Sequence, residues 1–179
     1  MRESNLAIAF ALIAEADLPE LTGVMTRAFD DDAQRHLGQP RGGPPGYDNG
    51  DFFRTWLFPY KQSVGFKILS EGKIIGAFIV WILPGGHNNL GAMFVDPPHQ
   101  DQGVGTRAWE FIEAIYPEAK SWTLETPIWA TRNHHFYEKL GFRRVPPEVQ
   151  KPSEENMIVY QRDDGGCQPI IGPFLRARH

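Results

Sequence analysis

Three strand-like segments follow one another between residues 64 and 95 with no helix between them. Residues 64–69 alternate apolar and polar side chains, Glu71-Gly72 follows, and residues 73–83 form an apolar run rich in Ile, Val, Phe and Trp. This pattern is typical of a β-hairpin with a buried second strand. Pro84-Gly85-Gly86 ends the run, and residues 90–95 predict a third buried strand. Because βαβ folds place a helix between successive strands, this order argues against an alternating parallel sheet.

Residues 7–51 predict a strand, a helix and an irregular excursion. We interpret the apolar run 7–14 as a core strand, and Asp17 with Glu20 as a capping box that starts a helix ending near residue 29. The segment 30–51 is polar and rich in turn residues, with Gly42-Gly43-Pro44-Pro45-Gly46 at its centre. We expect neither helix nor strand in this excursion.

The remaining chain predicts three more helices and three more strands. We expect the helices at residues 51–57, 103–116 and 131–140, and the strands at 121–125, 142–145 and 157–160. The fold class is therefore α/β, with a central sheet of about six to seven strands flanked by about four helices.

Composition restricts the chain to an ordinary globular protein. Its 179 residues are 41% apolar and carry a formal net charge of -4, which gives no broad attraction for nucleic acid or anionic lipid. No apolar stretch approaches the roughly 20 residues that a membrane span needs. We therefore expect a small-molecule or peptide partner. We interpret residues 1–162 as one domain and the Gly/Pro-rich segment 163–179 as a tail that is disordered or adds a strand.

The cysteine content and the N-terminus predict a cytoplasmic protein. Cys167 is the single cysteine, so no disulfide can form within the chain. Met1-Arg2, the apolar run and Ala14-Glu15-Ala16 superficially imitate a secretory signal with its cleavage site. However, Glu3 weakens the basic start and the apolar run is short, so we favour a strand there.

The segment from Phe94 to Thr106 carries the most informative pattern in the chain. A buried strand leads into a polar loop, and the loop opens a helix at Gly103 and Gly105. A diphosphate binds well to free backbone N–H groups at the positive end of a helix, and glycines allow it to approach them closely. These residues therefore predict a diphosphate-binding loop.

This loop resembles the Gln/Arg-x-x-Gly-x-Gly/Ala motif of the GNAT acetyltransferases, with Gln100, Gly103 and Gly105 in the three defining places. The resemblance implies the GNAT fold, with its mixed central sheet, and a loop that holds the diphosphate of coenzyme A. The residues that it assigns to the cofactor here are Phe94, Val95, Gln100, Asp101, Gln102, Gly103, Val104, Gly105 and Thr106.

A dinucleotide-binding fold is the main alternative interpretation of the same glycines. Residues 103–108 also fit the pattern G-x-G-x-x-A, and Glu125 lies about twenty residues further on, where a ribose-binding acid would stand. In Rossmann folds the glycines follow the strand almost at once, whereas residues 96–102 intervene here. A Rossmann-type NAD(P)-binding protein is therefore the lesser alternative. A Walker loop is excluded, because no Lys-Ser or Lys-Thr follows the glycines.

A second pattern occupies residues 133–142 and closely resembles the GNAT signature Phe-Tyr-x-Lys-x-Gly-Phe. The resemblance implies that Tyr137 is the general acid that protonates the departing CoA thiolate, with Phe136 beside the cofactor. Many family members carry an Asn six positions before the Phe of Phe-Tyr, where this chain has Ala130. We expect Asn133 to take over that contact to the CoA arm.

In the mechanism that the resemblance implies, a neutral amine attacks acetyl-CoA directly while both are bound. A backbone N–H near Phe94 and Val95 then donates a hydrogen bond to the thioester oxygen and stabilises the negative charge that develops there. The attacking amine must lose a proton. Glu125 is the first candidate base and Asp96 the second, although each also fits an ordinary strand-end acid. The adjacent histidines of the 131–140 helix diverge, so no metal site is predicted.

The acceptor is expected over the first helix and the excursion. Acids stand beside aromatic rings there, which suits a cationic amine, although such acids are also ordinary turn and cap residues. The acids are Asp30, Asp31, Asp32, Asp48 and Asp51, and the aromatic residues are Tyr47, Phe52, Phe53 and Trp56.

The sequence thus predicts an N-acetyltransferase that takes acetyl-CoA and a primary amine. Because the base is not assigned, a GNAT-like module that binds CoA as a sensor or partner domain without turnover stays open. An exposed hairpin edge or tail also allows a homodimer.

Overall fold

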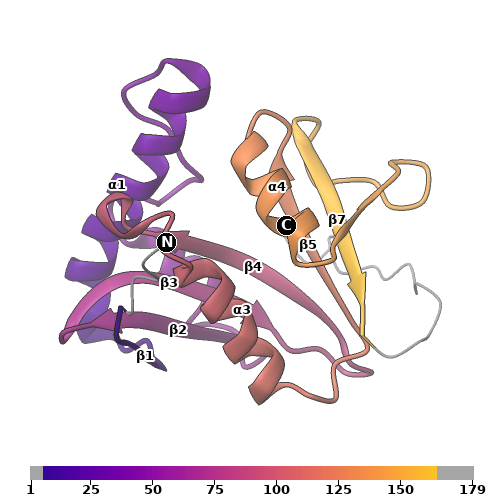
Figure 1. Ribbon diagram of the computed structural model, residues 1–179, viewed down its shortest axis with the longest axis horizontal. Coiled ribbons are helices and arrows are strands. Elements are labelled where there is room, and N and C mark those ends of the chain that lie inside the picture. The colour runs from indigo at the N-terminus through magenta and orange to yellow at the C-terminus, as the bar shows by residue number, and fades with distance from the viewer. Residues whose placement is uncertain (1–5, 165–179) are drawn as a thin grey trace. The chain divides into compact units, whose positions relative to one another are not determined.

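The computed structural model describes residues 6–164 and shows an α/β fold with a seven-stranded mixed sheet (Figure 1). The strands are hydrogen-bonded in the order β1-β2-β3-β4-β5-β7-β6. The strands are β1 (Ile8–Leu12), β2 (Ser63–Ser70), β3 (Lys73–Trp81), β4 (His87–Val95), β5 (Ser121–Pro127), β6 (Arg143–Val145) and β7 (Met157–Asp163). The helices are α1 (Leu18–Leu37), α2 (Asp51–Trp56), α3 (Val104–Ile115) and α4 (Thr131–Lys139), with short 3-10 turns at Glu15–Asp17 and Pro97–His99.

The described residues divide into two compact units. The first contains the described residues up to Val80 together with Ala92–Ile115, and the second contains Trp81–Gly91 and the described residues from Tyr116 onward.

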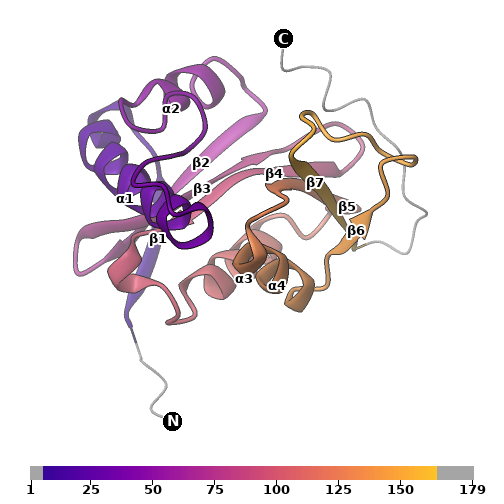
Figure 2. The same ribbon diagram turned by 90° about the horizontal axis from the view of Figure 1, so that it is seen from above.

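In the first unit, helices cover both faces of the strands. Figure 2 shows α1 and α2 over one face of β2 and β3 and α3 under the other. Phe111 of α3 stacks on Phe10 of β1 at a centroid distance of 4.4 Å and contacts Phe66 of β2 at 5.3 Å. Since β3 lies between these layers, its residues from Ile74 to Val80 are all buried.

In the second unit, α4 lies beside β5 and β7 (Figure 1). β5 and β7 pair antiparallel from Ser121↔Asp163 to Pro127↔Met157, and β6 pairs antiparallel with β7. The start of β4 pairs with β5 in parallel, from His87↔Ser121 to Asn89↔Thr123. The sheet is therefore mixed, and these antiparallel pairs exclude the Rossmann alternative, whose core sheet is essentially parallel.

The structure corrects the predicted start of the excursion. Residues 30–37 continue α1, which ends only at Gly38, a left-handed C-cap with a φ of 64°. The i,i+4 ion pair between Asp31 and Arg35 supports this last part of the helix, and Ala33 is buried beneath the excursion, 3.1 Å from where a Cβ on Gly42 would lie. The excursion therefore begins at residue 38.

Two further details of the N-terminal prediction are wrong. β1 is an edge strand rather than a core strand, and Leu12 at its end is 62% exposed. Asp17 and Glu20 form no capping box, because their carboxylates have other partners. Asp17 accepts from Lys67 Nζ at 2.8 Å, and Glu20 accepts from the backbone N–H of Ile74 at 2.9 Å. The tail prediction lies almost wholly outside the described residues, and β7 itself runs to Asp163.

Candidate active site

The predicted cofactor loop begins at Asp96, directly after β4, and its first turn is closed by backbone hydrogen bonds. The Asp96 N–H donates to the Ile75 carbonyl of β3 at 2.7 Å, and the His99 N–H donates to the Asp96 carbonyl at 2.8 Å. Gln100 N–H donates to the Pro97 carbonyl at 3.2 Å. These bonds form the 3-10 turn Pro97–His99 at the start of the predicted loop.

The loop reaches α3 through two residues in the left-handed region. Asp101 has a φ of 60° and Gly103 a φ of 76°. The first helical bond runs from the Arg107 N–H to the Gly103 carbonyl at 3.1 Å. The N–H groups of residues 104–106 therefore belong to the opening turn, where a helix offers no internal acceptor. Nothing lies within 4 Å of a Cβ placed on Gly103, so the approach to this turn is open and a diphosphate fits the donors present.

The two glutamine side chains of the motif support the loop from within. Gln100 Nε2 donates to the Val95 carbonyl at 2.9 Å, and Gln102 Nε2 donates to the Pro98 carbonyl at 3.1 Å. Each side chain thus donates at least one hydrogen bond to the backbone of the loop itself.

Asp96 is bound by an arginine that the sequence analysis did not single out. Arg27 of α1 donates from Nε to Oδ1 at 2.9 Å and from Nη2 to Oδ2 at 2.8 Å. The hydrogen bonds to Asp96 raise the pKa of the Arg27 guanidinium. The carboxylate of this candidate base is therefore fully engaged.

Phe94, on the strand that leads into the loop, is held among aromatic side chains. Its ring lies 6.3 Å from Phe29 of α1 and 6.4 Å from Phe53 of α2, measured between centroids. On β3, a Cβ added to Gly76 would come within 2.5 Å of the Phe94 carbonyl oxygen. The close approach of β3 to this part of β4 thus depends on a glycine.

In the second unit, Tyr137 of α4 is packed against aromatic rings. It is 8% exposed, and its ring centroid lies 5.2 Å from Phe136, 5.8 Å from Phe142 and 6.4 Å from Tyr160. Tyr160 is fixed in turn by a hydrogen bond from its hydroxyl to Glu138 Oε1 at 3.1 Å. These rings restrict the orientation of the Tyr137 side chain.

Glu125 and Asn133 also have partners within the second unit. Both carboxylate oxygens of Glu125 accept hydrogen bonds from Ser153, one from its N–H and one from its hydroxyl at 2.7 Å. Asn133 Nδ2 donates to Thr126 Oγ1 at 3.1 Å, and Ala130 occupies the N-cap of α4. Neither Ser153 nor Thr126 carries a sequence signal that would have identified it.

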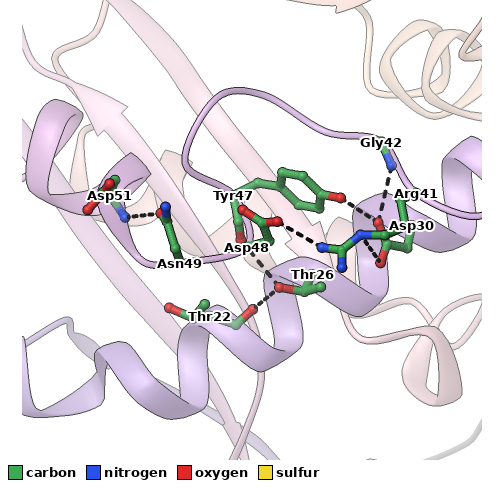
Figure 3. Close-up of polar contacts among 9 residues, drawn as sticks. All are labelled: Thr22, Thr26, Asp30, Arg41, Gly42, Tyr47, Asp48, Asn49 and Asp51. Carbon is green, nitrogen blue, oxygen red and sulfur yellow. Dashed lines mark hydrogen bonds and ion pairs between the residues drawn. The ribbon is translucent and has the colours of Figure 1, made fainter.

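The acids of the expected acceptor region form contacts among themselves and their neighbours (Figure 3). Asp30 of α1 accepts from the Tyr47 hydroxyl at 2.7 Å and from the Gly42 N–H at 3.2 Å. Arg41 pairs with Asp48 at 2.8 Å and reaches Asp30 at 4.0 Å. Asp31 pairs with Arg35, and Asp51 pairs with Arg54. Asp30 therefore holds the excursion on α1, whereas Asp31 and Asp51 form ion pairs within their own helices and Asp48 pairs with Arg41 inside the excursion.

Tyr47 lies at the centre of the contact between the excursion and α1. Its side chain is buried, and Figure 3 shows its hydroxyl directed at Asp30. Burial, and then the hydrogen bond to Asp30, raise the pKa of the Tyr47 phenol, because both disfavour the charged form.

Within residues 6–164, no cluster of three or more His, Cys, Asp or Glu side chains is arranged to hold a metal ion. No helix in the same range combines the length and apolar character of a membrane span.

Comparison with known proteins gives consistent results. The sequence profile of the acetyltransferase (GNAT) family matches residues 26–142. The uncharacterized protein YrkN of Bacillus subtilis (strain 168) is 33% identical over 159 residues, which cover 88% of this chain and 84% of YrkN.

Solved structures of several acetyltransferases share the fold. An acetyltransferase from Thermus thermophilus superposes with a TM-score of 0.72 at 17% identity, covering 88% of this chain and 97% of its own. The ribosomal-protein-S18-alanine N-acetyltransferase of Escherichia coli superposes with a TM-score of 0.69 at 17% identity, covering 90% of this chain and 97% of its own. The PaiA N-acetyltransferase of Thermoplasma acidophilum, in complex with coenzyme A, superposes with a TM-score of 0.66 at 13% identity, covering 89% of this chain and 100% of its own.

The raised pKa of Tyr47 predicts a stability difference that depends on pH. A group with a raised folded pKa stabilises the fold below its unfolded value, about 10 for tyrosine, and this contribution is lost as the pH rises through the folded value. At pH 7 we expect Tyr47→Phe to lower the free energy of unfolding by about 1 kcal/mol. Above about pH 10 the wild type should lose stability that the variant keeps, so that the difference shrinks.

Urea denaturation of both proteins at a series of pH values measures this difference. Tyr60→Phe, at an exposed position, controls for the loss of a hydroxyl from the surface. A difference between wild type and Tyr47→Phe that stays constant to high pH would contradict the proposed role of the Tyr47 contact.

Proposed function

Because this chain belongs to the acetyltransferase (GNAT) family, we propose that it is an N-acetyltransferase that moves an acetyl group from acetyl-CoA to a primary amine. The observation that carries the proposal is the opening turn of α3. It presents the N–H groups of residues 104–106 behind Gly103, to which the approach is open. This is the donor set that a diphosphate requires.

We propose that these amides and the loop 100–103 hold the diphosphate of CoA. Asn133 and Phe136 contact the CoA arm in this proposal. Phe136 stands in the place that the family motif gives it, and Asn133 takes over from the family's asparagine position, which is Ala130 here. Acetyl-CoA supplies an activated acyl carbon and a thiol leaving group. A backbone N–H near Phe94 and Val95 stabilises the charge on the thioester oxygen during attack.

Tyr137 is the proposed general acid. The amine nitrogen forms a bond to the acyl carbon while the carbon–sulfur bond breaks, and Tyr137 donates its phenolic proton to the departing thiolate. The rings of Phe142 and Tyr160 hold Tyr137 in place, which supports such a role, because a proton donor must be oriented within hydrogen-bond reach.

Glu125 is the preferred candidate for the base that takes the amine proton, directly or through a water. Its partner Ser153 belongs to an exposed loop and carries no charge. Asp96 is less suited, since protonation would break its paired bonds to Arg27.

The acceptor is proposed to be the primary amine of a small molecule or a peptide. One structural relative is by its name an acetyltransferase for the alanine of a ribosomal protein. In this chain Asp30, Asp31, Asp48 and Asp51 are paired with arginines or with Tyr47, which does not favour an acceptor of high positive charge.

One observation favours a second candidate function, a module that binds CoA without turnover. Both carboxylate oxygens of each candidate base accept hydrogen bonds, from Arg27 in the case of Asp96 and from Ser153 in the case of Glu125. A carboxylate so engaged must release a partner before it can take a proton.

The proposed function is tested first by cofactor binding. We expect acetyl-CoA to raise the melting temperature, because a ligand at 100 times its Kd adds about 2.7 kcal/mol to stability. NAD and NADP are the controls. A screen of amine classes with thiol release as the readout then identifies the acceptor. Absence of any stabilisation by acetyl-CoA or CoA would refute the enzyme assignment, whereas binding without thiol release from any amine would favour the CoA-binding module.

Tyr137→Phe separates chemistry from binding. We expect the variant to bind acetyl-CoA nearly as the wild type does and to turn over at least about 100-fold more slowly, because a general acid contributes about 10²–10⁴. The control is Tyr60→Phe, which removes a hydroxyl from an exposed tyrosine and should keep its turnover. If Tyr137→Phe turns over at the wild-type rate, Tyr137 does not act as the acid.

Glu125→Gln tests the base. The amide keeps the size of the side chain but cannot take a proton, so we expect kcat/KM to fall by about 100-fold and the acid limb of its pH profile to disappear. Binding of acetyl-CoA should not change. Glu154→Gln, at an exposed position in the same loop as Ser153, is the control. A wild-type pH profile in Glu125→Gln would mean that another group takes the proton.

A further inference from the structure

We infer that Arg27 is a positioning residue for the cofactor loop, and that it acts through Asp96 without touching the cofactor. This inference rests on the proposed function, since it concerns how the loop that binds acetyl-CoA is held.

The geometry places Asp96 at the point where the loop leaves the sheet. Its N–H is bound to Ile75 of β3, its carbonyl accepts from His99, and both carboxylate oxygens are bound by Arg27. Every polar group of Asp96 thus has a partner, and these partners come from a strand, from the loop itself and from α1. Only seven residues after Asp96, Gly103 precedes the opening turn of α3.

The exposures of the two side chains point to positioning rather than to core stability. The Asp96 side chain is 11% exposed, whereas that of Arg27 is 56% exposed. The loss of Arg27 would leave a nearly buried carboxylate without its charged partner, and such a group is strongly disfavoured. The carboxylate would turn toward water, and the first turn of the loop would move with it. An exposed arginine contributes little to the core, so the rest of the unit should stay folded.

The same turn of α1 also contacts β4 and the excursion. Phe29 lies between Phe94 and Tyr47, at centroid distances of 6.3 Å and 6.1 Å, and Thr26 Oγ1 lies 3.4 Å from the Tyr47 carbonyl. These contacts hold α1 in place independently of Arg27. The Arg27 guanidinium therefore binds Asp96 from a helix that is itself fixed.

The first test measures the loop in the protein without any cofactor. We expect Arg27→Met to speed hydrogen exchange at the amides of Asp96, His99 and Gln100 about tenfold, because local opening costs less once the anchor is lost. Amides of β3 away from Ile75 should keep their rates. Arg35→Met is the matched control, since it removes another exposed ion pair from the same helix.

The second test measures binding and turnover. We expect Arg27→Met to raise the Kd and KM for acetyl-CoA about tenfold, with kcat changed less than about twofold. A displacement of about 1 Å in a positioning group can lower the efficiency of an enzyme by up to about 100-fold, so a tenfold effect is of the expected size. Arg27→Lys should recover part of the affinity. Asp96→Asn should raise the Kd for acetyl-CoA as Arg27→Met does, and the Kd of the double variant should be no higher than that of either, because the two residues act as a unit.

The outcomes are distinguishable from failure of the proposed function. If the wild type does not bind acetyl-CoA, the proposed function fails, while the exchange measurement still tests the anchor. If exchange at residues 96–100 is unchanged in Arg27→Met, or if its Kd equals that of the wild type, the positioning role is refuted. Equal effects of Arg27→Met and Arg35→Met would refute it as well.

Discussion

A nearly buried carboxylate at the end of β4 requires a partner, and Arg27 of α1 supplies it with two parallel hydrogen bonds. Without that pair the first unit would contain a desolvated charge at the place where its sheet meets the cofactor loop. The pair also joins a helix to a strand end 69 residues further along the chain. The direction in which the loop leaves the sheet, and therefore the start of α3, depends on this contact.

The structural context of the two motifs could be predicted because each motif is contiguous. Gly103 and Gly105 open a helix after a strand, and Tyr137 lies between a helix start and Gly141, so local spacing alone indicates their structural context. Most strands and helices were also predicted correctly, since their apolar periodicity reflects burial on one face or on both. The class of fold follows from three consecutive strands, a signal that does not depend on any single residue.

The parts that could not be predicted depend on contacts between distant segments. Asp30, Asp31 and Asp32 look like turn residues, but Asp31 pairs with Arg35 one helical turn later and Asp30 is held by Tyr47 and Gly42 of the excursion. α1 therefore continues where local propensity alone would end it. Arg27 and Ser153 likewise have ordinary surroundings in the sequence, and their partners are known only from the fold. The acid-rich excursion suggested a cation site for the same reason, because the sequence does not show which charges neutralise one another.

In the proposed function, residues that never touch the ligand help to determine its affinity, and the loop after β4 illustrates why. The left-handed φ of Asp101 costs about 1 kcal/mol or more. Gly103 also increases the number of backbone conformations open to the loop when other contacts do not restrict it. Neutral backbone amides attract a diphosphate strongly only when they already point at it, since the ligand would otherwise have to order them on binding. Contacts of Gln100, the Asp96 backbone and Arg27 hold the loop in this conformation. In the proposed enzyme, the binding energy of the diphosphate is then used to hold the acyl group in place instead of ordering the loop.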